Sequence, residues 1–404
     1  ISRVLELSSS PTKYGVFRYF SNNKIPENIG LLCGLIHNQV YSDLSMSFLI
    51  CRNEFLGKGM NQLSELVFCR TPIFTQFFYT TLFRELVNFQ MPSAQFDKEE
   101  NELGANNDSF AFDYSENCIK AFGHPCLSHE GWKYSGTVTK LHYGENELDC
   151  PDLLRKSLME SFLRQKFDSK EISCREEILL LLEKSFGIVS SNTKKITLGL
   201  GETPIFWSIL ELVKESESVL YFPKGSYGYF IAMAEAKGVT YKLINTKKSN
   251  TFKMTVDDLK DSKLSKGSWI FLNMPLVNPT GSLYTPQEIH RIMEFATINN
   301  IKIIFDSIFF GLEFSSDRAN WDISDCSGQI PIEEGGYRDL EFYFLGGPSK
   351  EFAAGGLRFG YVFSSNTAMS NKASAKIAIQ PHFTVKFTMK KIYRDYINHS
   401  QNLM

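Results

Sequence analysis

The stretch WIFLNMPLVNPTGSLYTPQEIHRIMEFATINNIKIIFDS, residues 269–307, decides the class of fold. It opens with the apolar run 269–275, turns at the Asn-Pro-Thr-Gly of residues 278–281, and closes with the apolar run 302–306. Short apolar runs bounded by turn residues predict buried strands. The segment 285–300 between them begins with Thr-Pro and carries apolar residues at helical spacing, which predicts a helix. A strand, a helix and a second strand predict two parallel strands of one sheet.

The same alternation extends toward the N-terminus. The predicted elements are helix 150–165, strand 194–201, helix 203–215, strand 218–222, helix 228–238 and strand 240–245. Strands that alternate with covering helices predict an α/β fold, a three-layer αβα arrangement around a mostly parallel sheet. Ligands of such sheets bind beyond the carboxyl ends of the strands, so the residues at those ends are the candidates for a site.

The chain also contains an internal repeat. The segment LLCGLIHNQVYSDLSMSFLICRN, residues 31–53, aligns without a gap with FLGGPSKEFAAGGLRFGYVFSSN, residues 344–366, after a shift of 313 positions. Two chemically active residues of the second segment have different partners in the first: Lys350 aligns with His37, and Arg358 aligns with Ser45. The repeat predicts a duplicated domain in which one copy has lost a lysine and an arginine.

The composition excludes several classes of protein. With 43% hydrophobic and 22% charged residues among 404, the chain resembles an ordinary globular protein of one or two domains. With a net charge of −2, the chain lacks the excess of positive charge that is typical of proteins that bind nucleic acids. We find neither a signal peptide nor a run of 18 apolar residues, so no membrane span is predicted. The eight cysteines form no C-x-x-C pair, which favours a reducing compartment, and we expect a cytoplasmic protein.

Four residues near predicted strand ends form a set with chemical logic: Asn278, Asp306, Lys350 and Arg358. A lysine amine can form a Schiff base with an aldehyde cofactor. A buried carboxylate keeps the ring nitrogen of a pyridine protonated, which makes that ring a better electron sink. Arginine suits a phosphate through its two parallel donors. Each residue alone also has an ordinary structural explanation, such as a turn for Asn278 or a helix cap for Asp306.

Two neighbouring segments complete this set. GLGETP, residues 199–204, lies between a predicted strand and a predicted helix, where backbone N–H groups can hold a phosphate. FPKGSYGYF, residues 222–230, offers Tyr227 and Tyr229 for stacking on a flat ring. The first segment could instead bind a dinucleotide or S-adenosylmethionine, but it lacks the G-x-G-x-x-G pattern.

A further cluster has metal-ligand residue types, namely Cys118, His124, Cys126 and His129. Its spacing fits no common zinc site, and we predict no metal there.

The region from residue 141 to about Asn366 resembles the large domain of fold-type I, class I/II aminotransferases, which depend on pyridoxal phosphate (PLP). The resemblance implies that Lys350 is the Schiff-base lysine and that Arg358 holds the cofactor phosphate. It also implies that Asp306 pairs with the pyridine nitrogen and that Asn278 hydrogen-bonds the ring hydroxyl. The spacings from Asn278 to Asp306 and from Lys350 to Arg358 both agree with the family.

The remaining family positions lie in three segments. By the resemblance, Gly201, Glu202 and Thr203 cradle the phosphate, Tyr227 stacks on the ring, and Gly144 lies near the substrate carboxylate. The family usually has Tyr three residues after the acid, where this chain has Phe309, so one donor to the cofactor hydroxyl is lost. We also expect the chain to lack the family's C-terminal small domain, which carries the arginine that binds the substrate carboxylate.

A second resemblance accounts for the repeat. Plant methionine S-methyltransferases carry a methyltransferase domain followed by two aminotransferase-like regions, and the segments NPTGSLY (278–284) and GLEFSSDRANWD (311–322) resemble the second of these. The implied organisation is the tail of a degenerate copy at 1–92, a linker at 93–135, and an aminotransferase-like large domain at 136–404. His37 cannot form a Schiff base, so we expect the first copy to hold no cofactor.

The resemblance implies that the chain is part of an enzyme that makes S-methylmethionine from methionine and S-adenosylmethionine. The domain that binds S-adenosylmethionine would then lie outside this chain. Two other functions stay open: a PLP-dependent aminotransferase acting on a small amino acid, and a scaffold without catalysis. Because fold-type I sites form between two subunits, a homodimer is implied, and no nucleic-acid or membrane partner is expected.

Overall fold

The computed structural model describes residues 30–34, 47–51, 150–163, 173–313, 330–331, 340–377 and 380–400. The chain divides into two compact units, Ile1–Phe112 and Asp113–Met404. Their boundary falls within residues 93–135, and the assignment of these residues as a linker between two copies stays a prediction. No helix in the described ranges is long and apolar enough to cross a membrane.

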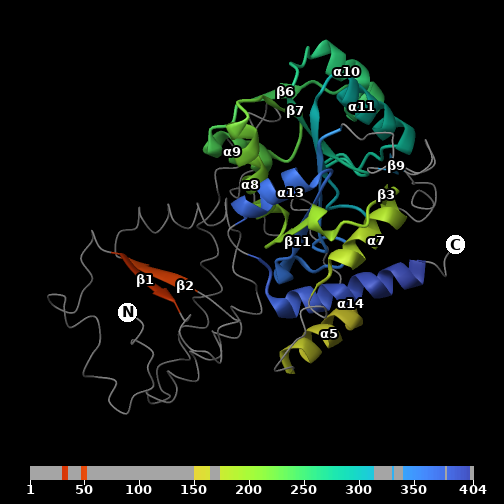
Figure 1. Ribbon diagram of the computed structural model, residues 1–404. Helices are drawn as coiled ribbons and strands as arrows, with labels where there is room; N and C mark the ends of the chain where they lie inside the picture. Colours follow the sequence, from red (N-terminus) through yellow and green to blue (C-terminus); the bar gives the residue numbers. More distant parts are fainter. Residues whose placement is uncertain are drawn as a thin grey trace, which may run out of the picture. The chain divides into compact units, whose positions relative to one another are not determined.

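A seven-stranded sheet lies at the centre of the second unit (Figure 1). Its strands are β4 (Ile196–Gly199), β5 (Leu220–Pro223), β6 (Tyr241–Ile244), β7 (Trp269–Asn273), β8 (Lys302–Asp306), β10 (Phe342–Gly346) and β11 (Gly360–Ser364). They are arranged in the order β4-β11-β10-β8-β7-β5-β6. The strands from β10 to β6 are parallel, whereas β11 is antiparallel to both its neighbours. The predicted mostly parallel sheet is therefore confirmed, with one reversed strand.

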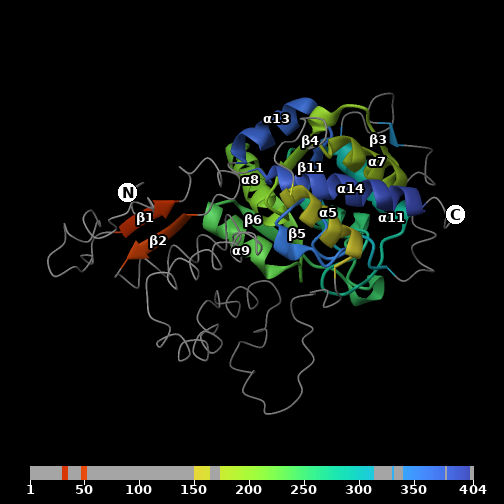
Figure 2. The ribbon, with the colours of Figure 1, turned by 90° about the horizontal axis from the view of Figure 1, so that it is seen from below.

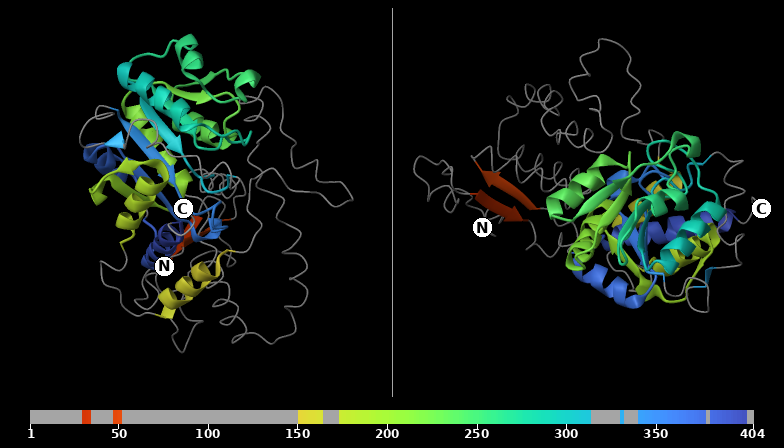
Figure 3. Two further views of the ribbon diagram at one scale, coloured as in Figure 1. Left: turned by 90° about the vertical axis from the view of Figure 1, so that its right-hand side faces the viewer. Right: turned by 90° about the horizontal axis from the view of Figure 1, so that it is seen from above.

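Helices cover this sheet. They are α5 (Asp152–Leu163), α7 (Arg175–Phe186), α8 (Glu202–Glu215), α9 (Gly228–Lys237), α10 (Val256–Asp261), α11 (Pro286–Ile298), α13 (Thr367–Lys376) and α14 (Phe383–Ser400). Two short strands, β3 (Ile188–Val189) and β9 (Ile330–Pro331), form a separate parallel pair. Helices α8 and α9 lie on one side of the sheet, and α7 and α11 lie on the other (Figures 1 and 2). Helices α5 and α14 pack against each other at one end of this unit (Figure 3).

Local sequence explains where the predicted helices begin and end. At α11, the Thr285 side chain accepts from the Glu288 backbone N–H and the Glu288 carboxylate accepts from the Thr285 backbone N–H, a capping box, with Pro286 at the first helical position. Helix α9 ends at Gly238, whose φ of 70° is the left-handed conformation that glycine adopts without strain.

Aromatic side chains fill the spaces between the sheet and its two helical layers. On one side, Phe206 of α8 packs against Phe230 of α9 and Phe271 of β7, with ring centroids 4.4 and 5.6 Å away. On the other side, Phe186 of α7 packs edge-on against Phe344 of β10 at 4.6 Å. The sheet is thus buried on both faces, which is why its strands read as continuous apolar runs.

In the first unit, the structure describes one antiparallel pair, β1 (Gly30–Gly34) with β2 (Ser47–Cys51). The 313-residue shift carries these strands onto β10 and β11 and preserves their register. Gly30 pairs with Cys51 as Tyr343 pairs with Ser364, and Leu32 pairs with Leu49 as Leu345 pairs with Val362. Since a slip of one residue would turn every side chain to the other face, this shared register supports a structural repeat.

Two leucines of α7 provide a matched test of the core. Leu182 is fully buried, whereas Leu180 is 46% exposed on the same helix. We expect Leu182→Ala to lower the free energy of unfolding by about 2–5 kcal/mol, because it leaves a cavity in the core. Leu180→Ala should change it by less than about 0.5 kcal/mol. Urea denaturation of both variants measures this difference, and equal losses would contradict the packing of α7.

Candidate functional site

The candidate site lies at the carboxyl ends of the central parallel strands. Asp306 is the last residue of β8, and it pairs in register with Asn273 at the end of β7 and Leu345 near the end of β10. Asp306 is only 3% exposed. A buried carboxyl group in the middle of a sheet needs hydrogen-bonding partners, and the neighbouring strand ends supply them.

Asp306 accepts hydrogen bonds on both carboxyl oxygens. Asn273 Nδ2 donates to Oδ2 at 2.7 Å, and the Ile308 backbone N–H donates to Oδ1 at 3.0 Å. The side chain of Glu202 makes a third contact with it, a hydrogen bond between the two carboxyl groups. The acid that the sequence analysis placed at the ring nitrogen is therefore held in a fixed orientation.

Glu202 is the first residue of α8, and its side chain reaches across to Asp306. It is 7% exposed, and its Oε1 atom is buried without a hydrogen-bond partner. A carboxyl group in the first turn of a helix is normally stabilised as the anion. Here burial and the nearby charge of Asp306 outweigh that effect and raise the pKa of Glu202 well above its ordinary value.

Burial raises the pKa of Asp306 to about 6, while its hydrogen bonds from Ile308, Glu202 and Asn273 act in the opposite direction. The hydrogen bond between the two acids lowers the pKa of Asp306 and raises that of Glu202, so Glu202 is the donor and Asp306 the acceptor of the proton between them. The charge of Lys350 lies close enough to favour the ionised form of Glu202, which is the weakest of the effects on that group.

Arg358 lies against the start of α8. Its Nη2 donates to the carbonyl oxygen of Leu200 at 3.1 Å, and its Nη1 donates to that of Gly355 at 3.2 Å. Its Nε atom is buried without a hydrogen-bond partner. The residue has a φ of 52°, which is rare for an arginine and indicates a constrained position.

Two glycines allow the arginine and the helix start to approach so closely. A Cβ atom on Gly201 would lie 2.7 Å from Arg358 Nη2, and one on Gly360 would lie 2.5 Å from the Gly201 carbonyl carbon. Gly201 also has a φ of 99° and caps α8 without any side chain. The result is a cradle of helix N–H groups and a guanidinium, the donor set that binds a phosphate.

Lys350 follows β10 and completes the group. Its Nζ lies 5.9 Å from the centroid of the Phe309 ring, where the resembled family usually has a tyrosine. Two buried tyrosines lie near the acids: burial and then the Glu202 charge raise the pKa of Tyr361, and burial is the main cause of the raised pKa of Tyr393, to which Glu202 contributes least. The amine, the acid pair and the cradle thus lie together.

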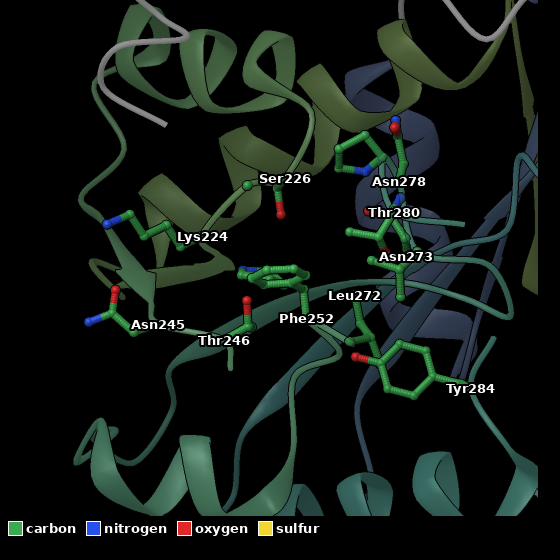
Figure 4. A pocket seen from close by; sticks show the side chains of 14 residues that line it. Lys224, Ser226, Asn245, Thr246, Phe252, Leu272, Asn273, Asn278, Thr280 and Tyr284 are labelled. Carbon is green, nitrogen blue, oxygen red and sulfur yellow. The ribbon is translucent and has the colours of Figure 1, made fainter. Parts of the chain in front are cut away.

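Asn278 lies beside this group, in the wall of a pocket of about 450 Å³. Figure 4 shows Phe252 among the lining side chains, with Lys224, Asn245 and Thr246 on one side and Asn273, Asn278 and Thr280 on the other. Asn273 contacts both the pocket and Asp306. Asp306, Glu202, Lys350 and Arg358 are not among the residues that line this pocket, so Asn273 is the link between it and the acid pair.

The other predicted residues have the following places. Thr203 is half-buried in the first turn of α8. Tyr227 caps α9, with its ring centroid 5.5 Å from that of Phe230 and 5.9 Å from that of Tyr229. Gly144, His37, Ser45 and the cysteine-histidine cluster at residues 118–129 lie outside the described residues.

The sequence analysis overlooked Asn273 and the side-chain role of Glu202. Asn273 is a polar residue that ends a buried apolar run, the same signal that marked Asp306. Glu202 was expected only as part of a phosphate cradle, because nothing in a linear pattern shows that its side chain crosses to β8.

The raised pKa of Asp306 predicts a pH dependence of stability. The folded chain binds this proton more tightly than the unfolded chain, so the stabilisation is complete below about pH 4 and is lost as the pH rises through about 6. The groups that face Asp306 and Glu202 are Asn273, Lys350, Tyr361 and Tyr393. Relative to the wild type, the free energy of unfolding of Asp306→Asn should rise by up to about 3 kcal/mol between pH 4 and pH 7, at about 1.4 kcal/mol per pKa unit.

Urea denaturation at each pH measures this gain. Asp257→Asn is the matched control, because the Asp257 side chain is 84% exposed. If the difference in the free energy of unfolding between the wild type and Asp306→Asn stays constant with pH, the raised pKa of Asp306 is contradicted.

Comparison with known proteins agrees with this geometry. The family model "Aminotransferase class I and II" matches residues 147–400. Among curated relatives, methionine S-methyltransferase of Hordeum vulgare is 28% identical and that of Arabidopsis thaliana 25%, each over 97% of this chain. The chain spans only 36% of the length of either relative.

The fold has solved counterparts. The aromatic aminotransferase from Pyrococcus horikoshii superposes with a TM-score of 0.53 at 20% identity, covering 67% of this chain and 72% of that one. This likeness confirms the predicted PLP-dependent transferase fold. Since the family model spans more than half of the residues, the chain belongs to the class I and II aminotransferases.

Proposed function

We propose that this chain is the aminotransferase-like region of a methionine S-methyltransferase and that its second unit binds PLP. The similarity to the plant methyltransferases runs through both units, over 97% of the chain. The methyl transfer from S-adenosylmethionine to methionine is then assigned to parts of the longer protein outside this chain. The role of this region is to bind a cofactor and, through it, a small amino acid.

The observation that carries the cofactor assignment is the meeting of three chemically distinct groups at one sheet edge. They are the amine of Lys350, the buried carboxylate of Asp306, and the cradle of Arg358 with the start of α8. The orphaned Nε of Arg358 and the close approach of its guanidinium to Gly201 at the start of α8 both fit a phosphate. The residues present therefore fit PLP.

When bound, PLP supplies an aldehyde and an electron-withdrawing pyridinium ring. Lys350 would attach the cofactor covalently through Nζ. Asp306 would hold the proton on the ring nitrogen, for which its hydrogen bonds from Asn273 and Ile308 orient it. Arg358 and the N–H groups of α8 would bind the phosphate. Phe309 covers the amine with an apolar ring and donates no hydrogen bond to the cofactor hydroxyl, which would leave the ring less firmly held.

A PLP-dependent aminotransferase is the second candidate function. It is favoured by the presence of Lys350 and Arg358 together, since a pure scaffold has no need of either. Substrate screening of the full-length protein with amino acids and keto acids distinguishes this candidate from the first.

The assignment predicts covalent attachment at Lys350. Incubation with PLP should produce a new absorbance band, and borohydride reduction followed by peptide mapping should place a pyridoxyl group on Lys350. The adduct should be lost in Lys350→Ala. It should remain in the control Lys242→Ala, because Lys242 is an exposed lysine. Absence of any adduct in the wild type would contradict cofactor binding and leave the scaffold function.

A further inference from the structure

Glu202 stands out as an acid inside a site built for an anionic cofactor. It follows Gly201 directly, so its backbone belongs to the phosphate cradle. Its side chain is 93% buried, since 7% is exposed, and one carboxyl oxygen has no hydrogen-bond partner. Leaving such an atom unpaired has a free-energy cost, which indicates that the position serves something other than stability.

The space around Asp306 is already filled. Its two oxygens accept from Asn273 and from the Ile308 backbone, and the Glu202 carboxyl approaches as the third neighbour. Asp306 is 3% exposed, and the Glu202 carboxyl is one of the groups against it. Asn273 and Ile308 are fixed by β7 and by the chain after β8, whereas a glutamate side chain can rotate away.

We propose that Glu202 is an internal competitor of the cofactor, whose carboxyl group occupies the position beside Asp306 that the pyridine nitrogen needs. This inference rests on the proposed function. PLP would bind only in chains in which Glu202 has given up its contact with Asp306. The fraction of such chains sets the apparent affinity for PLP, so the cofactor would occupy the site only at high PLP concentration.

Glu202 is therefore a residue that determines cofactor occupancy, while the binding itself depends on Lys350, Asp306 and Arg358.

Three substitutions separate the explanations. Glu202→Ser shortens the side chain and frees the space beside Asp306. Glu202→Gln cannot ionise, but it keeps the size of the side chain and the ability to donate to Asp306. Glu176→Ser is the matched control, because Glu176 is an exposed acid in the first turn of α7.

The experiment is titration of the full chain with PLP, followed by absorbance and calorimetry. We expect Glu202→Ser to bind PLP about tenfold more tightly or better, a gain of about 1.4 kcal/mol. Glu202→Gln should stay near the wild type, as should Glu176→Ser. The affinity for pyridoxal, which has no phosphate, should rise by the same factor in Glu202→Ser. The affinity for inorganic phosphate should not change.

The outcomes are distinct. Unchanged or weaker binding in Glu202→Ser would overturn the inference while leaving the proposed function intact if the wild type binds. An equal gain in PLP affinity in Glu202→Gln and Glu202→Ser would also overturn the inference, because charge repulsion would then explain the effect. A gain in affinity for inorganic phosphate alone would overturn it for the same reason. Tighter binding by Glu202→Ser, with the wild type saturating only at higher PLP concentration, would support it. If neither binds, the proposed function fails together with the inference. Should Glu202→Ser fail to fold, Glu202→Ala carries the same expectation.

Discussion

The burial of Asp306 at the end of β8 is the constraint on which the rest of the site depends. A carboxyl group with 3% exposure must be neutralised or hydrogen-bonded, and the sheet order places its neighbours accordingly. Asn273 comes from β7 on one side, and the Lys350 turn follows β10 on the other. Glu202 arrives from α8 and donates a hydrogen bond to it. Moving β7 would remove the Asn273 hydrogen bond from this buried acid.

The second constraint is the close approach of β11 to the start of α8. It requires two glycines in contact and an arginine in a left-handed backbone conformation. Strain of this kind persists only where surrounding structure enforces it, and it places a guanidinium with an orphaned Nε beside free helix N–H groups. The acid pair and this cradle are separate structural solutions, and Lys350 lies near enough to act with both.

Much of this could be predicted from the sequence, for identifiable physical reasons. The segment 269–307 shows its strands and helix because buried strands are continuous apolar runs and α11 has a full capping box. Asp306, Lys350 and Arg358 could be selected because strand ends carry ligands in such folds. The side-chain contact from Glu202 to Asp306 could not be predicted, because 104 residues separate them and their meeting depends on the order of strands in the sheet. The reversed direction of β11 was likewise not visible, since an apolar run gives no sign of strand direction.

The shared register of β1–β2 and β10–β11 is structural evidence for the internal repeat. The same pairing persists although the sequence between the strands has exchanged Lys350 for His37 and Arg358 for Ser45. The apolar residues of the two strands specify their pairing, and both segments are rich in them, whereas Lys350 and Arg358 lie between β10 and β11. A copy can therefore lose its chemistry and keep its pairing.

The central claim is that PLP and Glu202 contend for one position beside Asp306. A pair of crystal structures of the full chain, grown with and without PLP, tests it most directly. In the absence of the cofactor, we expect Glu202 to lie against Asp306. In its presence, we expect Lys350 joined to PLP, the ring nitrogen on Asp306, and Glu202 turned away. A structure in which PLP is bound at Lys350 while Glu202 keeps its contact with Asp306 would contradict it.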